Sequence, residues 1–188
     1  MRIVLLLLLA SISFGQSGPP VTQAQRLKWA TLASVGPPSL AAGVFTSAFS
    51  TAQNNPREYG PHWDGYIKRQ GLRLTGAAAS NLMEAELGAM WGEDPRYRRA
   101  AAGSAKGRVW HAVKTAFLAY DRNGNTMPAY ARFVAVPTSN VIANSWRPDS
   151  QHTVGQTTTR ISLGFVSRIA ANTFAEFWPD IRRAIRKK

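Results

Sequence analysis

The chain has 188 residues, no cysteine, and 23 Lys plus Arg against 10 Asp plus Glu, which gives a formal charge of +13. The lack of cysteine excludes disulfides and a lipid-anchored N-terminal cysteine, so a packed core must supply the stability. So basic a chain favours anionic partners.

The first fifteen residues have the three-part layout of a secretory signal. Arg2 makes the start positive, an apolar run of eight residues follows, and residues 11–15 are smaller and more polar. Ser13 and Gly15 stand where a signal peptidase reads the chain, so we predict a signal peptide over 1–15, cut before Gln16. Loss of Arg2 lowers the charge from +13 to +12. Export makes anionic lipid or an envelope polymer the expected partner, and nucleic acid is not expected.

Two segments precede the centre of the sequence. Residues 16–36 contain one Gly-Pro-Pro and end at the glycine of a second, and we predict a flexible leader. Residues 38–52 carry no charge and place apolar side chains at helical spacings. At about 1.5 Å per residue this helix is shorter than a bilayer core of about 30 Å, which favours a buried core helix over an interfacial segment.

The long segment from Trp63 to Trp91 predicts a helix that is apolar or small around most of its circumference. Such a helix is enclosed by others. Gly, Ala and Ser are frequent in it, and residues such as Gly76 and Ala78 would let neighbouring backbones approach closely. Arg73, Glu84 and Glu86 favour a soluble bundle over a membrane setting.

Further helices follow along the chain. Residues 109–120 show amphipathic spacing, and Asp121 to Asn125 reads as a turn. A calcium loop there is rejected because Thr126 and Arg132 stand where that loop needs Gly and Glu. We predict a helix from Pro128, capped by Thr126 and broken at Pro137, a second piece over 139–146, and a last helix from Thr153 that Pro179 interrupts. The expected fold is all-α, about five helices in one bundle over 37–188.

One group of polar residues could support chemistry. His62 and Asp64, beside Glu58 and joined in space by Glu84, Glu86 or His111, could bind a metal or act in acid–base catalysis. No second ligand pair has the i, i+3 or i, i+4 spacing of carboxylate-bridged bundles, and His111 reads as a solvated residue. Glu86, if enclosed, would pair with an arginine. No nucleophile or phosphate-loop motif is present, and no metal or cofactor is expected.

The C-terminal end has the layout of an amphipathic membrane-surface helix. An apolar stripe runs through Phe174, Phe177, Trp178, Ile181 and Ile185. Five basic residues flank it: Arg182, Arg183, Arg186, Lys187 and Lys188. We predict that Trp178 and these five residues form a surface-binding site.

Three stretches carry a resemblance. They are Asn55-Pro-Arg-Glu-Tyr-Gly60, followed by Gly65-Tyr-Ile-Lys-Arg69; Glu93-Asp-Pro-Arg-Tyr97; and Asn172-Thr-Phe-Ala-Glu-Phe-Trp-Pro-Asp-Ile181. They resemble an uncharacterised family of exported bacterial proteins best represented among acidobacteria. The resemblance implies export and helicity, and it brings no known activity. Gly92 stands where that family is expected to have His, so no metal role is carried over.

These observations together predict an exported protein that binds or scaffolds at the cell envelope without catalysis. The alternative is a small helical enzyme or metal-binding protein that uses Glu84 and Glu86 with His62 and Asp64.

Overall fold

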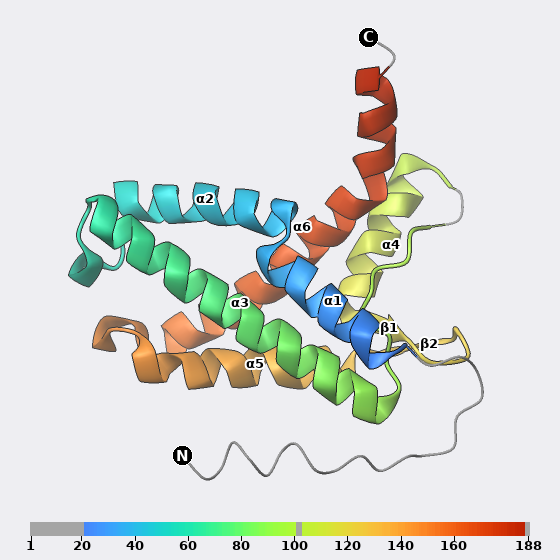
Figure 1. Ribbon diagram of the computed structural model, residues 1–188, viewed down its shortest axis with the longest axis horizontal. Coiled ribbons are helices and arrows are strands. Elements are labelled where there is room, and N and C mark those ends of the chain that lie inside the picture. Colours follow the sequence, from blue (N-terminus) through green and yellow to red (C-terminus); the bar gives the residue numbers. More distant parts are fainter. Residues whose placement is uncertain (1–20, 101–102, 187–188) are drawn as a thin grey trace.

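Six α-helices and one short β-hairpin make up the described part of the chain, residues 21–100 and 103–186 of a computed structural model. The helices are α1 (Gln23–Val35), α2 (Pro37–Ala52), α3 (Trp63–Trp91), α4 (Ala105–Phe117), α5 (Tyr130–Ala143) and α6 (Val154–Arg186), with short 3-10 turns η2 (Arg57–Tyr59), η3 (Asn144–Trp146) and η4 (Asp149–Gln151). Helix α3 runs through the middle and packs against α1, α2 and α5, while α4 packs against α6 (Figure 1). The prediction of an all-α single-domain bundle is confirmed.

Helix α1 corrects the prediction of a flexible leader over 16–36. Thr22 and Gln25 form a capping box at its start, which satisfies backbone donors that the helix leaves free. Arg26 and Ala30 are buried, and Nη1 of Arg26 donates to the carbonyl of Ala85 on α3 at 3.3 Å. Packing against α3 therefore holds this segment as a helix, although its own apolar periodicity extends over only a few residues. The predicted signal peptide and residues 16–20 lie outside the described residues.

Helix α2 is not the buried core helix that its composition predicts. Its inward residues are small or polar: Gly43 and Ser47 are buried, and Ser47 donates to Oε1 of Gln70 on α3 at 2.9 Å. All its large apolar side chains are exposed, namely Leu40, Val44, Phe45 and Phe49. Close contact with a polar patch of α3 requires small residues, so the apolar face points outward. Among the described residues, Gln23–Ala52 is the one segment long and apolar enough to span a membrane. Signal sequences and the core helices of soluble proteins have the same length and composition. Gly36 divides the segment into the two helices α1 and α2.

Helix α3 has the predicted bounds, but its close contacts lie elsewhere than predicted. A Cβ at Gly76 would meet nothing within 4 Å, and Ala78 is half-buried, so neither marks a tight contact. The tight contacts are at Gly65 and Gly88. A Cβ on Gly65 would lie 2.3 Å from the carbonyl oxygen of Tyr59 and 2.4 Å from that of Gly60.

We therefore expect Gly65→Ala to lower the free energy of unfolding by about 1–3 kcal/mol, because overpacking against backbone forces a shift. The backbone there cannot yield easily, since Arg69 donates to the carbonyls of both Gly60 and Pro56 at 2.8 Å. Gly71→Ala, in the same helix with open space around it, is the control. It should raise stability by up to about 1 kcal/mol through helix propensity. Urea unfolding measures both, and an equal shift in the two variants would contradict the contact.

The segment after α4 differs from the prediction in detail. Helix α4 ends at Phe117, and β1 (Leu118–Tyr120) pairs antiparallel with β2 (Thr126–Pro128). Thr126 therefore lies in a strand and does not cap a helix. The predicted turn between the strands is present, with Oδ1 of Asp121 accepting from the backbone N–H groups of Asn123 and Asn125 at 2.8 Å.

Neither proline ends its helix. Pro137 lies inside α5 and Pro179 inside α6, whereas the sequence predicted breaks at both. Proline removes one backbone hydrogen bond and crowds the preceding turn. Residues on both sides of Pro137 are buried, including Ala135, Val136 and Ser139, so packing against the bundle holds α5 together across the proline.

The distribution of side chains between core and surface is unusual. Within the described residues, the buried hydrophobic ones are nine alanines and Val136, and the largest fully buried side chain is that of Glu176. Large apolar residues of every helix are exposed, Phe45 by 73% and Trp63 by 71%. Small residues and ion pairs therefore fill the core, and the apolar bulk faces outward.

Candidate functional site

The structure does not bring the predicted polar site together. His62 immediately precedes α3 and Asp64 lies in its first turn, and both are exposed. Glu84 lies twenty residues further along the same helix than Asp64, which at 1.5 Å per residue separates their backbones by about 30 Å. Within residues 21–100 and 103–186, no three His, Asp or Glu side chains group as metal ligands would.

Glu84 is instead the centre of a buried ion-pair triad. Its Oε1 lies 2.9 Å from Nη2 of Arg132 on α5, and its Oε2 pairs with Arg168 on α6. Arg132 also donates to the carbonyls of Thr115 and Ala116 at the end of α4. Burial lowers the pKa of Arg168 to about 10, although the charge of Glu84 opposes this shift. The triad thus ties α3, α4, α5 and α6 together.

Glu86 and His111 have smaller roles. Glu86 is exposed and accepts a hydrogen bond from Nε2 of Gln23 at 2.7 Å, so the enclosed carboxylate with arginine partners is Glu84. His111 is half-buried on α4, and its Nε2 lies 2.9 Å from the carbonyl oxygen of Arg98.

Two of the sequence stretches that carry the resemblance, residues 93–97 and 172–181, contact each other. In the first, Glu93 accepts from the backbone N–H of Ala131 at 3.1 Å and so caps the start of α5. Burial raises the pKa of Glu93. Asp94 pairs with Arg96 and Arg98. The hydroxyl of Tyr97 contacts the second stretch by donating to Oε2 of Glu176 at 2.7 Å.

Glu176, on α6, binds both α4 and the segment between α3 and α4. It accepts hydrogen bonds from Tyr97, the backbone N–H of Ala100, and Nε of Arg108 at 2.7 Å. Burial by itself would raise the pKa of Glu176, but these hydrogen bonds outweigh it and hold the pKa below its usual range. Arg108 also pairs with Asp180 at 2.7 Å and lies over the ring of Phe177. One turn of α6 is therefore fixed to α4.

Beyond that turn α6 projects away from the bundle (Figure 1). We call residues 174–186, which include the fixed turn and the part beyond it, the C-terminal arm. Four of its five stripe residues are exposed, by 42–66%: Phe174, Trp178, Ile181 and Ile185. Phe177 is half-buried under Arg108. Arg182, Arg183 and Arg186 are exposed, Arg183 pairing with Asp180, while Lys187 and Lys188 lie outside the described residues. The arm thus carries exposed apolar and basic side chains together.

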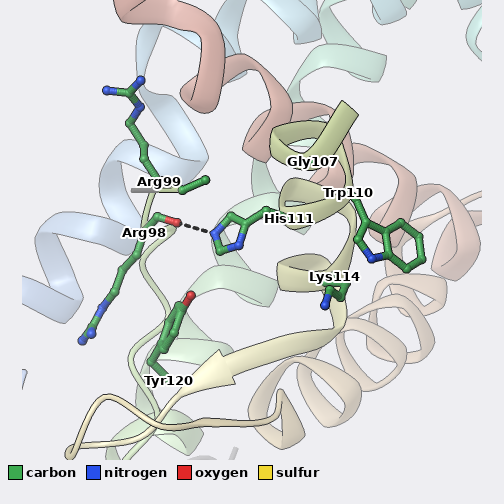
Figure 2. A pocket seen from close by; sticks show the side chains of 8 residues that line it. Arg98, Arg99, Gly107, Trp110, His111, Lys114 and Tyr120 are labelled. Atoms are coloured by element: carbon green, nitrogen blue, oxygen red, sulfur yellow. Dashed lines mark hydrogen bonds between the residues drawn. The ribbon is translucent and has the colours of Figure 1, made fainter. Parts of the chain in front are cut away.

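A hollow of about 590 Å³ lies beside α4 (Figure 2). Its walls include Arg98, Arg99, Trp110, His111, Lys114 and Tyr120, with no carboxylate among the lining residues. Figure 2 shows the side chains of Arg98 and Arg99 turned away from it, and the guanidinium of Arg98 lies 4.8 Å from the ring centre of Tyr120. The hollow therefore offers basic and aromatic side chains: Lys114, His111, Tyr120 and the exposed indole of Trp110.

Sequence reasoning missed most of the ionic framework. Arg132 is the only charged residue of α5, a signal that its charge is paired inside the fold. From the sequence, Glu176 and Asp180 were noted only as part of the stretch 172–181. Their partner Arg108 is 68 residues away from Glu176 along the chain, which no local pattern reveals.

Comparison of the chain with protein-family models, curated proteins and solved structures found no match.

Proposed function

We propose that this protein is exported and binds an anionic lipid surface of the cell envelope, acting as a non-catalytic binding or scaffolding protein. The observation that carries the proposal is the C-terminal arm, where exposed Phe174, Trp178, Ile181 and Ile185 run beside exposed arginines. Apolar residues flanked by basic ones characterise helices that lie in a membrane interface.

Export rests on the sequence of residues 1–15, with its positive start, apolar run and small residues at the cleavage positions. The resemblance to exported bacterial proteins agrees with it. We propose cleavage before Gln16 and a periplasmic or envelope location.

Lipid is favoured over a polar envelope polymer because the exposed surface is apolar as well as basic. The outward face of α2 adds Val44, Phe45 and Phe49, and no charged residue occurs anywhere in that helix. Contiguous apolar surface on a protein marks contact with another apolar surface. A polymer bound through charge alone would leave this surface exposed to water.

The expected strength is moderate and depends on salt. Each basic residue near an anionic membrane contributes about 1 kcal/mol, and the attraction fades over a Debye length of about 8 Å at physiological salt. Arg183 contributes less than its neighbours because Asp180 already pairs with it. The pKa of Asp180 is lowered by its hydrogen bonds with Arg108 and Arg183, so this carboxylate stays charged at neutral pH.

Cosedimentation with vesicles tests the proposal. Mature protein should sediment with vesicles that contain about 30% anionic lipid at low salt, be released as salt rises, and stay in solution with neutral vesicles. The test variant replaces Arg182, Arg186, Lys187 and Lys188 by Gln and spares the ion-paired Arg183. The matched control replaces Lys28, Arg57, Lys68 and Lys106, which are exposed and lie outside the arm.

Both variants lose the same number of positive charges, so they differ only in where on the protein those charges lie. The arm variant should lose about tenfold or more in vesicle affinity, while the control keeps most of it. Equal binding by the two variants would contradict docking through the arm. Binding to an isolated anionic envelope polymer but not to vesicles would replace lipid by polymer as the partner.

A further inference from the structure

Two arginines at one end of the molecule lack the counter-charge that such groups normally have. Arg147 follows η3, and Arg160 lies in the second turn of α6; both are half-buried. Within the described residues, neither makes an ion pair with a carboxylate. Guanidinium groups removed from water are normally paired, because an unpaired buried charge is costly.

The two guanidinium groups are held close together by a shared partner. Nη1 of Arg147 donates to the side-chain oxygen of Gln151 at 3.0 Å, and Nη1 of Arg160 donates to the backbone carbonyl of the same residue at 2.8 Å. Arg160 also donates to Asn144 and Thr157 through Nη2. All of these acceptors are neutral, so they orient the two side chains without cancelling the charge.

Three polar atoms in this cluster are buried without a hydrogen-bond partner. They are Nε of Arg147, Nε of Arg160, and the hydroxyl oxygen of Tyr59. The connection that carries Tyr59 and the one that carries Arg147 lie next to each other in Figure 1, at the end of the bundle away from β1 and β2. Buried donors are almost always satisfied, so these atoms are free to donate to a ligand or to ordered water.

The neighbouring groups support a ligand of negative charge. Burial lowers the pKa of both arginines, and in Arg160 the charge of Arg147 adds to the effect. Burial also raises the pKa of Tyr59, so its hydroxyl keeps its proton and can donate. Two carboxylates lie near these groups: Asp149 faces His152, and Glu58, next to Tyr59, accepts a hydrogen bond from Ser150.

We propose that Arg147, Arg160 and Tyr59 form a binding site for a phosphate group. Phosphate suits the site because its oxygens accept several hydrogen bonds at once and arginine binds them in a fixed, planar geometry. The group can come from free phosphate or from a phospholipid head group. The second source rests on the proposed lipid binding, whereas the site itself does not, since it lies far along α6 from the C-terminal arm.

Thermal unfolding with inorganic phosphate and chloride at equal ionic strength tests the site. Phosphate at about ten times its Kd should raise the Tm of the mature protein by about 3 °C relative to chloride. Arg147→Gln should abolish this rise. In chloride its own Tm should equal or exceed that of the parent, because the variant lacks one unpaired buried charge. Arg182→Gln, with the same loss of charge on the arm, should keep the full response to phosphate.

Tyr59→Phe is a second variant that keeps the ring against Arg69, whose guanidinium lies 5.6 Å from the ring centre. It should weaken phosphate binding about tenfold by calorimetry, the loss of one charge-assisted hydrogen bond. The proposal is overturned if phosphate and chloride give the same Tm, or if Arg182→Gln loses the response as fully as Arg147→Gln.

Vesicles distinguish the two sources of phosphate. If a head group occupies the site, Arg147→Gln should reduce binding to phosphatidic acid vesicles several-fold while leaving the arm intact. If free phosphate is the ligand, Arg147→Gln should bind vesicles like the parent and lose only the thermal response. Failure of the arm variant to lose vesicle binding would bear on the proposed function alone.

Discussion

Replacing Glu84 by Gln should destabilise the protein by about 3–5 kcal/mol, the largest effect that we expect from a single substitution. The change keeps the size of the side chain but leaves Arg132 and Arg168 buried beside each other with no negative charge between them. The two arginines come from α5 and α6, so the loss should affect the whole bundle and appear as one cooperative transition in urea unfolding.

Glu86→Gln is the matched control for this prediction. Glu86 lies two residues further along the same helix, is exposed, and makes one hydrogen bond to Gln23. Its loss should change the free energy of unfolding by no more than about 0.5 kcal/mol. A triple variant that replaces Glu84, Arg132 and Arg168 by Met should regain most of the lost stability, since apolar residues can replace a buried ion-pair triad. Equal effects of Glu84→Gln and Glu86→Gln would show that the triad does not stabilise the fold.

Glu176→Gln should lower the free energy of unfolding by about 3 kcal/mol at pH 7, and the difference from the parent should shrink in acid. The pKa of Glu176 is lowered in the folded protein, because hydrogen bonds from Arg108, Tyr97 and Ala100 outweigh the effect of burial. The carboxylate therefore contributes its full stability above the unfolded-state pKa of about 4.3, and this contribution is lost as the pH falls through the folded-state value.

Urea unfolding at pH 7 and pH 3 measures this dependence. Asp180 also has a lowered pKa and shares Arg108 with Glu176, so a changed pKa of Asp180 in the variant contributes to the difference. Tyr97→Phe removes one hydrogen bond from the same carboxylate and should cost about 1 kcal/mol at pH 7. A loss for Glu176→Gln that is equally large at both pH values would contradict the role of its charge.

The helices with strong apolar periodicity were predictable from the sequence, and the effect of the two internal prolines on the helix ends was not. The helix Trp63–Trp91 has the predicted bounds because its pattern is long and Gly92 ends it in the left-handed conformation with φ of 78°. Pro137 and Pro179 were read as stops, yet α5 and α6 continue through them. A local rule gives the cost of a proline, and only the packing of the surrounding turns decides whether that cost ends the helix.

The candidate sites divide in the same way. The arm could be read from local spacing, and the structure leaves Trp178, Arg182, Arg183 and Arg186 exposed. The group of His62, Asp64, Glu84 and Glu86 was assembled from residue types alone, and the length of α3 separates the first two residues from the last two. Tyr59, Arg147 and Arg160 come from three segments that meet only in the folded chain, so no spacing in the sequence relates them.

By itself, the sequence determined the helical class, the basic charge and the apolar arm, because each depends on composition or on periods of a few residues. The tertiary structure decided which side of each helix faces inward. In α2 the inward side is the small and polar one, since the neighbouring helix presents Gln70 at the contact. It also decided which charges are buried, since Glu84 and Glu176 find their arginines only through contacts between residues 48 to 84 positions apart.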